Sequence, residues 1–555
     1  MSNTITINII NTGTTIEVVG GTTLSQIAGQ LNDTLGFNPI CARVNNKTQG
    51  LDYTVYQPKQ IEFLDRTSDS GSRAYVRSLC MIFYAALLDI SPRARLKIEH
   101  SIAGGYYCII DGLDINDSTI TTIKERINNL VSRDIKIERH QRPTAEVIDI
   151  FRRQGLDDKA QLLSGLGQLY SVYHTIGAVA DSYYGCLAPS TGYIDVWDIT
   201  PYKDGVLLRA FDPENPSHVA QVIRHDKLFN AFTRYLDFNH IIGISNVAQL
   251  NAIDSRRSVT DLINVAEALH EKYIARISDD ITRHFHERGT RFVLIAGPSS
   301  SGKTTFTKRL AIQLRTNLLD PVSISLDNYF VDRAHTPRDA AGDYDYESLY
   351  ALDLEAFNND LGRLLAGEQV MMPTYDFETG SRKYRGNTIQ LKDNSVILLE
   401  GIHGLNPGLT AGIDDHYKYR IYVSALTTIS IDDHNWVPTT DNRLLRRIVR
   451  DYKYRGTSAL ETLRRWPSVR RGEEQWIFPY QENADAMFNS SLLFELSVIR
   501  DRALDILSRV PEDVPEYATA YRLAKFLSYF RPVPAELLPA TSLLREFIGG
   551  SAFHY

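Results

Sequence analysis

The stretch from Gly297 to Thr305 constrains this chain more than any other. It reads Gly-Pro-Ser-Ser-Ser-Gly-Lys-Thr-Thr and fits the pattern G-x-x-x-x-G-K-[ST]. Five apolar residues, Phe292 to Ala296, come before it and predict a buried parallel strand. The helical spacing of Phe306, Leu310 and Leu314 predicts a helix after it. A strand, a glycine loop and a helix start in this order predict a P-loop.

A P-loop binds phosphate through its backbone N–H groups and the N-terminus of its helix. Lys303 can place an ammonium between the β- and γ-phosphates of ATP, and Thr304 can offer its hydroxyl to Mg²⁺. The alternative is a glycine loop that only turns the chain. We expect the phosphate-binding residues to be Gly297, Ser299, Ser300, Ser301, Gly302, Lys303, Thr304 and Thr305.

Composition excludes several classes of protein. A chain of 555 residues predicts roughly three or four domains, and 43% hydrophobic residues are ordinary for a globular protein. The net charge of -7 argues against a general nucleic-acid-binding surface. The four cysteines form no CxxC pair. Because no apolar run approaches the roughly 18 residues of a membrane span, and the start lacks signal-peptide features, we expect a cytoplasmic protein and no membrane partner.

Residues 1–64 predict a β-grasp module. Ile5, Ile7 and Ile9 alternate with polar residues as in a strand, and the segment 15–19 returns as a second strand. Thr22 or Thr23 can cap a helix, and short strands near 42–44 and 61–63 complete the order. This order resembles the TGS domain at the start of threonyl-tRNA synthetases.

Residues 65–72 read as a linker, and residues 74–258 as an α+β domain. Helices are expected at 75–88, 122–131 and 145–154, and strands at 95–99, 106–110 and 135–138. The order, with the motif at 189–192, is similar to the second, editing-type domain of threonyl-tRNA synthetases. That domain carries paired histidines and a later cysteine–histidine pair. Because the region around Tyr75 and Leu79 holds no histidine and Leu187 replaces the later one, we expect no metal site and no editing chemistry.

Residues 259–289 predict one long helix that connects the two halves. Its apolar positions fit core packing, and a coiled-coil contact in a homo-oligomer is the alternative. Residues 511–555 predict a helical tail, with helices near 521–530 and 542–548, that packs on the sheet or covers the N-terminal half.

Two further apolar strands, in the region 290–510, each end on a carboxylate. The segment 322–326 ends on Asp327 and the segment 396–399 ends on Glu400. In a doubly wound parallel sheet, ligands bind at the carboxyl ends of the strands, so Gly297, Asp327 and Glu400 should converge. Asp327 suits a general base, and Glu400 suits the magnesium side of the site. Further strands are expected at 419–423 and 492–496.

Several short motifs occur in a fixed order after the P-loop. They are Asp327-Asn328-Tyr329-Phe330, Tyr344-Asp345-Tyr346, Pro373-Thr374-Tyr375-Asp376-Phe377, Leu399-Glu400-Gly401-Ile402 and Arg446-Arg447-Ile448-Val449-Arg450-Asp451. With the P-loop they resemble the uridine kinase and phosphoribulokinase superfamily, uridine kinases most closely, over roughly residues 290 to 500. The fold class implied is an α/β P-loop kinase with a doubly wound parallel sheet, preceded by the β-grasp module and the α+β domain.

The resemblance implies roles for particular residues. Asp327 matches the catalytic aspartate, Asp345 the one that holds ribose hydroxyls, and Tyr375 a tyrosine of the nucleoside pocket. Tyr329 and Arg382 lie in the same substrate-binding motifs. The cofactor-binding lid is matched by Arg447, Arg450 and Arg455. Independently, Arg443, Arg446, Arg447 and Arg450 share one helix face, where they could neutralise charge during transfer.

Two departures leave the acceptor open. Gly380 stands where the family has a histidine that reads the pyrimidine edge, and Thr457 replaces a lid arginine. The sequence therefore predicts an ATP- and Mg²⁺-dependent kinase that phosphorylates the 5′-hydroxyl of a uridine- or cytidine-like nucleoside. One alternative is a kinase for a phosphorylated sugar or another alcohol. The other is a P-loop NTPase switch with an RNA-binding N-terminal half, although Asn46-Lys47 starts no guanine-binding motif.

Overall fold

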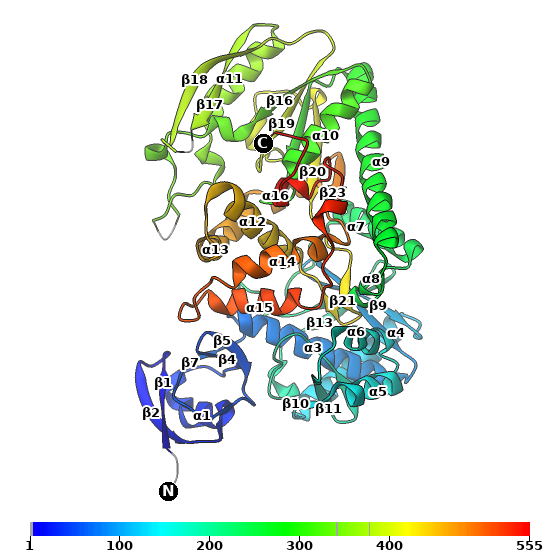
Figure 1. The fold of residues 1–555 in the computed structure, drawn as a ribbon, viewed down its shortest axis with the longest axis vertical. Coiled ribbons are helices and arrows are strands. Elements are labelled where there is room, and N and C mark those ends of the chain that lie inside the picture. The colour runs from blue at the N-terminus through cyan, green and yellow to red at the C-terminus, as the bar shows by residue number, and fades with distance from the viewer. Residues whose placement is uncertain (1–3, 340–341, 377, 555) are drawn as a thin grey trace.

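The computed structural model describes residues 4–339, 342–376 and 378–554. Two N-terminal modules lie at one end of an elongated molecule, and the five-stranded sheet that carries the P-loop lies at the other (Figure 1). The long helix α9 (Arg256–Arg288) runs along one side from the second module to that sheet.

The first module is the predicted β-grasp. Its sheet has the order β2-β1-β7-β4-β5, with β1 and β7 parallel, and α1 packs against it. Thr23 caps α1 in a capping box, as one of the two predicted caps. Ile7, Ile9 and Leu24 are buried in the core. The elements are β1 Thr4–Ile9, β2 Thr14–Val19, β3 Thr22–Thr23, α1 Leu24–Gln30, α2 Asn32–Leu35, β4 Cys41–Val44, β5 Lys47–Gly50, β6 Thr54–Val55 and β7 Lys59–Leu64.

The second module surrounds the buried helix α3 with two sheets, β13-β14-β9-β8 and β10-β11-β12. Two predicted boundaries were wrong. Ser68 caps α3, so the helix begins at Asp69 inside the expected linker, and the strand expected at 135–138 begins only at Glu138. The elements are α3 Asp69–Ile90, β8 Arg95–Ile102, β9 Gly105–Asp111, α4 Asp117–Ser132, β10 Glu138–Pro143, α5 Thr144–Gln154, α6 Asp157–Leu166, β11 Tyr170–Ile176, β12 Val179–Asp181, β13 Asp198–Tyr202 and β14 Gly205–Arg209.

Three helices connect this module to the P-loop strand. They are α7 (Asp226–Ile242), α8 (Val247–Asn251) and α9. Ile263, Ala266, Ile274 and Ile281 of α9 are buried in the core that includes α10 (Lys303–Thr316) and the sheet. The apolar face of α9 therefore packs inside the molecule, as the core interpretation of this helix expects.

The central sheet has five parallel strands in the order β16-β19-β15-β20-β23. They are β15 Phe292–Ala296, β16 Asp320–Ser325, β19 Ser395–Glu400, β20 Lys418–Ser424 and β23 Ala486–Asn489. Side chains of β15 enter two separate apolar clusters, because Val293 and Ile295 belong to one and Phe292 and Leu294 to the other. The sheet is covered on both faces, as in the predicted doubly wound P-loop kinase fold.

Helices and one hairpin complete this half. The strand expected at 492–496 was wrong, because Glu495 begins the helix α14 and the fifth strand lies a few residues earlier. The hairpin β17-β18 lies next to α11 at the upper left of Figure 1. The elements are α11 Leu354–Leu365, β17 Val370–Asp376, β18 Ser381–Ile389, β21 Ser430–Asp432, β22 Asn435–Trp436, α12 Thr439–Arg455, α13 Ala459–Trp476 and α14 Glu495–Leu507.

The C-terminal tail contacts the first N-terminal module, the helices α12 and α14, and the P-loop. Helix α15 (Tyr517–Leu527) packs on α14 and reaches β5 of the first module, and α16 (Arg545–Ile548) packs on α12. The tail therefore reaches the N-terminal half, one of the two regions that the sequence suggested for it, and its contacts in the kinase half are with the helices α12 and α14 and with the P-loop. No helix in the described part of the chain combines the length and the apolar character that a membrane span needs.

Candidate active site

The P-loop follows β15 and depends on two close approaches. A Cβ at Gly297 would lie 2.0 Å from the carbonyl oxygen of Val423 on the neighbouring strand. Gly302 has φ +85°, and a Cβ there would lie 2.5 Å from Leu543 of the tail. Only glycine fits such positions, since any side chain would displace the backbone or the tail. These contacts fix where α10 begins, and with it the orientation of the loop's N–H groups.

Lys303 is the first residue of α10 and is buried beneath the loop. Its ammonium donates to the carbonyl oxygens of Gly297, at 2.9 Å, and Pro298, at 3.2 Å. Burial lowers the pKa of Lys303, and the negative charges of Glu400 and Asp327 oppose that shift. The lysine is thus held at the loop with two carboxylates close enough to act on its charge.

Thr304 and Glu400 form a direct pair at the end of β19. The hydroxyl of Thr304 donates to Oε1 of Glu400 at 3.2 Å. Burial raises the pKa of Glu400 to about 7, Lys303 lowers it, and the charges of Asp327 and Glu546 raise it further. A hydroxyl and a carboxylate are oxygen ligands that a hard divalent cation prefers, so this pair fits a magnesium ion.

Two serines of the loop support that fit. The hydroxyls of Ser300 and Ser301 are buried and have no hydrogen-bond partner among the described residues. Buried polar groups are normally hydrogen-bonded, so orphaned hydroxyls within a phosphate-binding loop fit a polar ligand. The N–H of Ser299 instead donates to Glu473 of α13, at 3.1 Å.

Asp327 follows β16 in a short 3-10 turn, Leu326–Tyr329, and its side chain is exposed. Protein on several sides limits its contact with bulk water, which raises its pKa, while Lys303, Arg455 and Arg450 oppose the rise. Leu326 lies against Gly401, where a Cβ would be 2.6 Å from the Leu326 side chain. The ends of β16 and β19 are therefore adjacent, and Asp327 faces solvent within the electrostatic reach of Lys303 and Glu400.

The arginines of α12 divide into two groups, which corrects the expectation of one phosphate-facing stripe. Arg443 and Arg446 are fully buried and pair with Glu473 and Glu495. Their guanidinium groups also donate to the carbonyl oxygens of Ser299, at 3.0 Å, and Ser300, at 3.4 Å. The charges of these two arginines are neutralised inside the protein. Their side chains therefore stabilise the backbone of the P-loop and do not face a ligand.

The predicted lid arginines lie nearer the solvent. Arg447 donates to the hydroxyl of Ser299 at 2.9 Å. Arg450 and Arg455 both pair with Asp451, at 2.8 Å and 3.6 Å, and the side chain of Arg455 is 58% exposed. Arg450 and Arg455 lower the pKa of Asp327, so both lie within electrostatic reach of that aspartate.

The residues expected to bind the acceptor occupy different environments. The carboxylate of Asp345 accepts from the N–H of Glu347 at 3.1 Å. Tyr375 is buried, and Arg382, its partner in the hairpin register, pairs with Asp353 at 2.7 Å. The remainder of the Asp376 motif, Phe377, lies outside the described residues.

Tyr329 requires a correction. It is completely buried, and its hydroxyl donates to Asp360 at 3.0 Å. Its ring packs against Phe357. A side chain held this way supports the loop that carries Asp327 and does not reach an acceptor.

Gly380 has an unexpected neighbour. It has φ +67°, and a Cβ there would lie 2.7 Å from Nε of Arg333. The guanidinium of Arg333 therefore lies where a side chain at position 380 would begin. The family resemblance places a base-reading histidine at position 380. In this chain the side chain of Arg333 occupies the space next to Gly380 instead.

Three glutamates at the site were missed by sequence reasoning. Glu473 is fully buried beneath the P-loop, Glu546 of the tail accepts from Thr305, and Glu347 lies beside Gly472 of α13. Burial raises the pKa of Glu347 to about 7, and Glu473 adds to the rise. Buried arginines need acidic partners that neutralise their charge. The arginine-rich segment 443–455 therefore indicated that such partners exist, but it did not indicate where in the sequence they lie.

Comparisons with known proteins found similarity to the C-terminal half of the chain. A model of the phosphoribulokinase / uridine kinase family matches residues 292–493. The uridine kinase of Staphylococcus aureus (strain JH9) is 31% identical over 199 residues, which are 36% of this chain and 86% of that protein. A structure described as a possible uridine kinase from Bacillus stearothermophilus is 22% identical and covers 36% of this chain and 89% of its own, with a TM-score of 0.25. A D-glycerate 3-kinase from Cryptococcus neoformans is 13% identical and covers 45% and 87%, with a TM-score of 0.21.

A parallel sheet, a P-loop at its first strand and acidic residues at the neighbouring strand ends define a P-loop kinase in the C-terminal half. The chain belongs to the phosphoribulokinase and uridine kinase family, with about a third of its length matched and the N-terminal modules outside the match.

Proposed function

We propose that this protein transfers the γ-phosphate of ATP to the 5′-hydroxyl of a uridine- or cytidine-like nucleoside. The observation that carries the proposal is the meeting of three strand ends. They bring the ammonium of Lys303, the exposed carboxylate of Asp327 and the Thr304–Glu400 pair into electrostatic contact. This is the set of groups that phosphoryl transfer needs, a phosphate cradle, a base and a metal ligand set.

The residues then have separate tasks. Loop N–H groups and Lys303 hold the phosphates of ATP, and Arg447, Arg450 and Arg455 add positive charge from α12. Asp327 accepts the proton of the attacking hydroxyl, and its raised pKa makes it a stronger base than a free aspartate. Thr304 and Glu400 would hold Mg²⁺, which neutralises charge on the phosphates when bound. Asp345, Tyr375 and Arg382 lie in the motifs that would position the acceptor.

One observation favours a second acceptor class. The guanidinium of Arg333 lies against Gly380, where a base-reading histidine is absent. A cation at this place suits an anionic acceptor such as a phosphorylated sugar, since arginine binds phosphate in a bidentate manner. The two acceptor classes make opposite predictions for Arg333→Gln. With a phosphorylated sugar its KM for the acceptor should rise about tenfold or more, whereas with an uncharged nucleoside it should change little.

The test combines an acceptor panel with one variant. The full-length protein is incubated with γ-labelled ATP, Mg²⁺ and each of uridine, cytidine, other nucleosides and several sugar phosphates. Labelling of a nucleoside supports the first acceptor class, and labelling of sugar phosphates alone supports the second.

Asp327→Asn tests the base itself. Loss of a general base typically costs 10²–10⁴-fold in rate, so transfer should fall by roughly that factor. Because no hydrogen bond between described residues joins the Asp327 side chain to the loop's backbone donors, ATP should still bind, which titration calorimetry measures. Normal turnover in this variant, or loss of ATP binding together with transfer, would contradict the assigned role. Asp343→Asn, an exposed aspartate of a neighbouring loop, serves as the control.

A further inference from the structure

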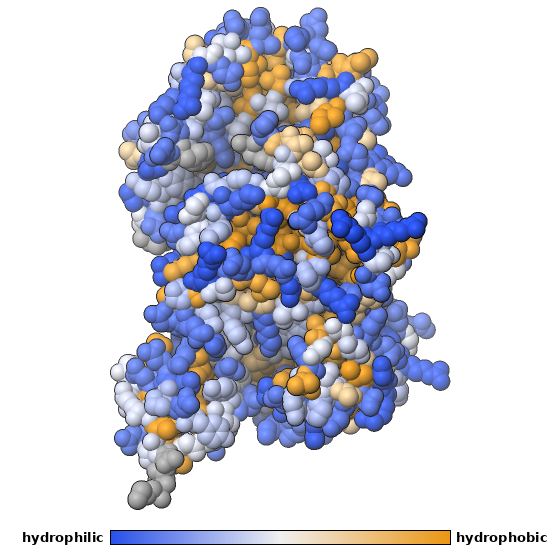
Figure 2. Space-filling model, viewed as in Figure 1, coloured by the Kyte–Doolittle hydropathy of each residue, from blue (hydrophilic) through white to orange (hydrophobic). Residues whose placement is uncertain are grey.

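A second cavity lies far from the P-loop, between the two N-terminal modules and the tail. Its volume is about 630 Å³. Strand β5 and helix α3 line one side, β11 another, and α15 closes it from the kinase half. In Figure 2 the surface is hollowed between the two lower lobes, below α15. A space of this size can hold a nucleotide-sized molecule.

The lining is strongly basic. Asp52, Asp69 and Asp432 are the acidic residues among the lining side chains, against more than twice as many cations. The lining cations are Arg43, Arg73, Arg77, Arg139, Lys159, Arg522 and Lys525. The protein as a whole has a net charge of -7, so this excess of positive charge is local. Walls of low dielectric focus such a field into the cavity, which attracts anions.

Four of these cations are already paired. Arg43 pairs with Glu62 at 2.7 Å, Lys159 with Asp181 and Asp432, Arg522 with Asp441, and Arg73 loosely with Asp69 at 3.9 Å. Among the described residues, Arg77, Arg139 and Lys525 have no carboxylate within ion-pair distance. Arg77 donates instead to the carbonyl oxygen of Cys186, at 2.9 and 3.0 Å.

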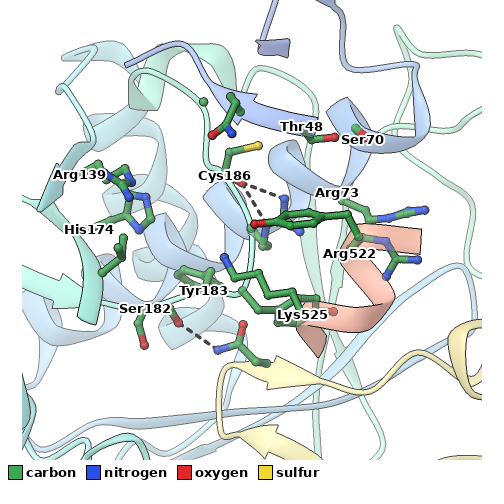
Figure 3. A pocket seen from close by; sticks show the side chains of 18 of the residues that line it. Thr48, Ser70, Arg73, Arg139, His174, Ser182, Tyr183, Cys186, Arg522 and Lys525 are labelled. Atoms are coloured by element: carbon green, nitrogen blue, oxygen red, sulfur yellow. Dashed lines mark hydrogen bonds between the residues drawn. The ribbon is translucent and has the colours of Figure 1, made fainter. Parts of the chain in front are cut away.

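The three cations without a carboxylate act on one another. Lys525 extends from α15 into the cavity, toward the side that carries His174 and Arg139 (Figure 3). Burial lowers the pKa of Lys525, and the charges of Arg139 and Arg77 lower it further. Like charges gathered without a counter-ion cost free energy, which a bound anion would recover.

A buried polar atom adds to this picture. His174 is 5% exposed, and its Nδ1 has no hydrogen-bond partner among the described residues. Arg139 lies within electrostatic reach of the same ring. Tyrosines that line the cavity, including Tyr183 and Tyr521, supply apolar faces next to the cations. Charge, an orphaned polar group and aromatic faces together suit a phosphate-bearing molecule with a ring.

We propose that this cavity is a second ligand site, distinct from the P-loop, that binds a phosphorylated small molecule of nucleotide size. Arg77, Arg139 and Lys525 contact its phosphate groups, and the tyrosines contact its uncharged part. The proposal does not depend on which acceptor the kinase uses.

The test counts binding sites in the full-length protein. Equilibrium dialysis measures the equivalents of labelled ATP, UTP, UMP, ribose 5-phosphate and pyrophosphate bound, with uncharged uridine for comparison. The cavity variant is R139Q/K525Q, since both side chains line the cavity while keeping contact with solvent, and neither forms a hydrogen bond to the backbone of the described residues. The control is R133Q/K272Q, which removes the same charge from exposed positions outside the lining.

We expect at least one phosphate-bearing probe to bind in the cavity. Its affinity there should fall about tenfold or more in R139Q/K525Q and stay unchanged in the control. A Lys303→Ala variant should lose the P-loop equivalent and keep this one, so failure of the kinase assignment and failure of the cavity site are distinguishable. Binding of no probe outside the P-loop, or equal binding by both double variants, would overturn the proposal. The same dialysis includes a labelled RNA oligonucleotide, and binding of this RNA while every small probe fails to bind would also overturn the proposal.

Discussion

The side chain of Glu400 illustrates how a catalytic position costs stability. Burial raises its pKa from 4.5 to about 7. An acid whose pKa is raised on folding is harder to ionise in the folded state than in the unfolded state. Ionisation of Glu400 therefore does not affect stability below pH 4.5. It destabilises the folded protein increasingly as the pH rises from 4.5 to 7, and by a constant amount above pH 7. The form proposed to bind Mg²⁺ is the ionised one, which is also the form that destabilises the protein.

Glu400→Gln should consequently stabilise the metal-free protein at pH 8 by on the order of 2 kcal/mol, with no gain below pH 4.5. The expected gain is smaller than the full pKa shift would give, because the carboxylate still meets water. Thermal melting in chelator at several pH values measures the difference. The same variant should lose Mg²⁺-dependent transfer. Glu17→Gln, an exposed glutamate of β2, is the control, and a gain that is equal at pH 5 and pH 8 would contradict the account.

Sequence reasoning reached these residues because a parallel sheet places its strand ends together. Asp327 and Glu400 were found from the apolar runs before them, with no knowledge of the third dimension. Glu473 and Glu546 could not be found this way, since they contact the loop from 174 and 241 residues further along the chain. Arg443 and Arg446 were misjudged for the same reason, because a helix face shows the spacing of charges but not their partners.

At the scale of elements, the short helix α16 is the part of the tail that touches the P-loop. The carboxylate of Glu546 accepts from the N–H of Thr305 at 3.2 Å and from its hydroxyl at 2.7 Å. The first-turn N–H groups of α10 are those that a phosphate would use. The tail therefore places a negative charge on donors that belong to the proposed ATP site.

Glu546→Gln should lower the KM for ATP about fivefold, corresponding to about 1 kcal/mol, because a neutral amide competes less well for these donors. Initial rates at varied ATP concentration measure it. Glu536→Gln, exposed in the same tail, should leave KM unchanged. A higher KM for Glu546→Gln would instead show that the glutamate supports the loop.

Strands and helices differed in how well the sequence predicted them. The five apolar residues of β15 predicted a strand correctly, and the helical spacing of the apolar residues in α9 predicted a helix correctly. The run 492–496 was misread as a strand, because a short apolar stretch fits a buried strand and a buried helix start equally. Helix α7 was not predicted, although Phe229, Phe232 and Leu236 keep helical spacing.

At the scale of the whole molecule, a buried ion cluster joins the second module to the kinase half. Lys159 of α6 contacts Asp181 at 3.0 Å and Asp432 of β21 at 2.7 Å, and His434 contacts Asp181 at 2.8 Å. All four side chains are almost fully buried. The two halves therefore share one polar core, which the sequence could not reveal because its members come from separate modules.

Lys159→Met keeps most of the side-chain volume but leaves two buried aspartates with less positive charge. Breaking a buried pair on one side typically costs 3–5 kcal/mol, so the unfolding free energy should fall by about that amount. Urea unfolding of the full chain measures it, with Lys272→Met as the exposed control. The triple variant K159M/D181N/D432N removes the charge of both aspartates that Lys159 contacts and should recover a large part of the loss. If Lys159→Met unfolds like the control, the cluster does not hold the halves together. A cost that the triple variant shares would point to lost packing, since the aspartates would no longer be the cause.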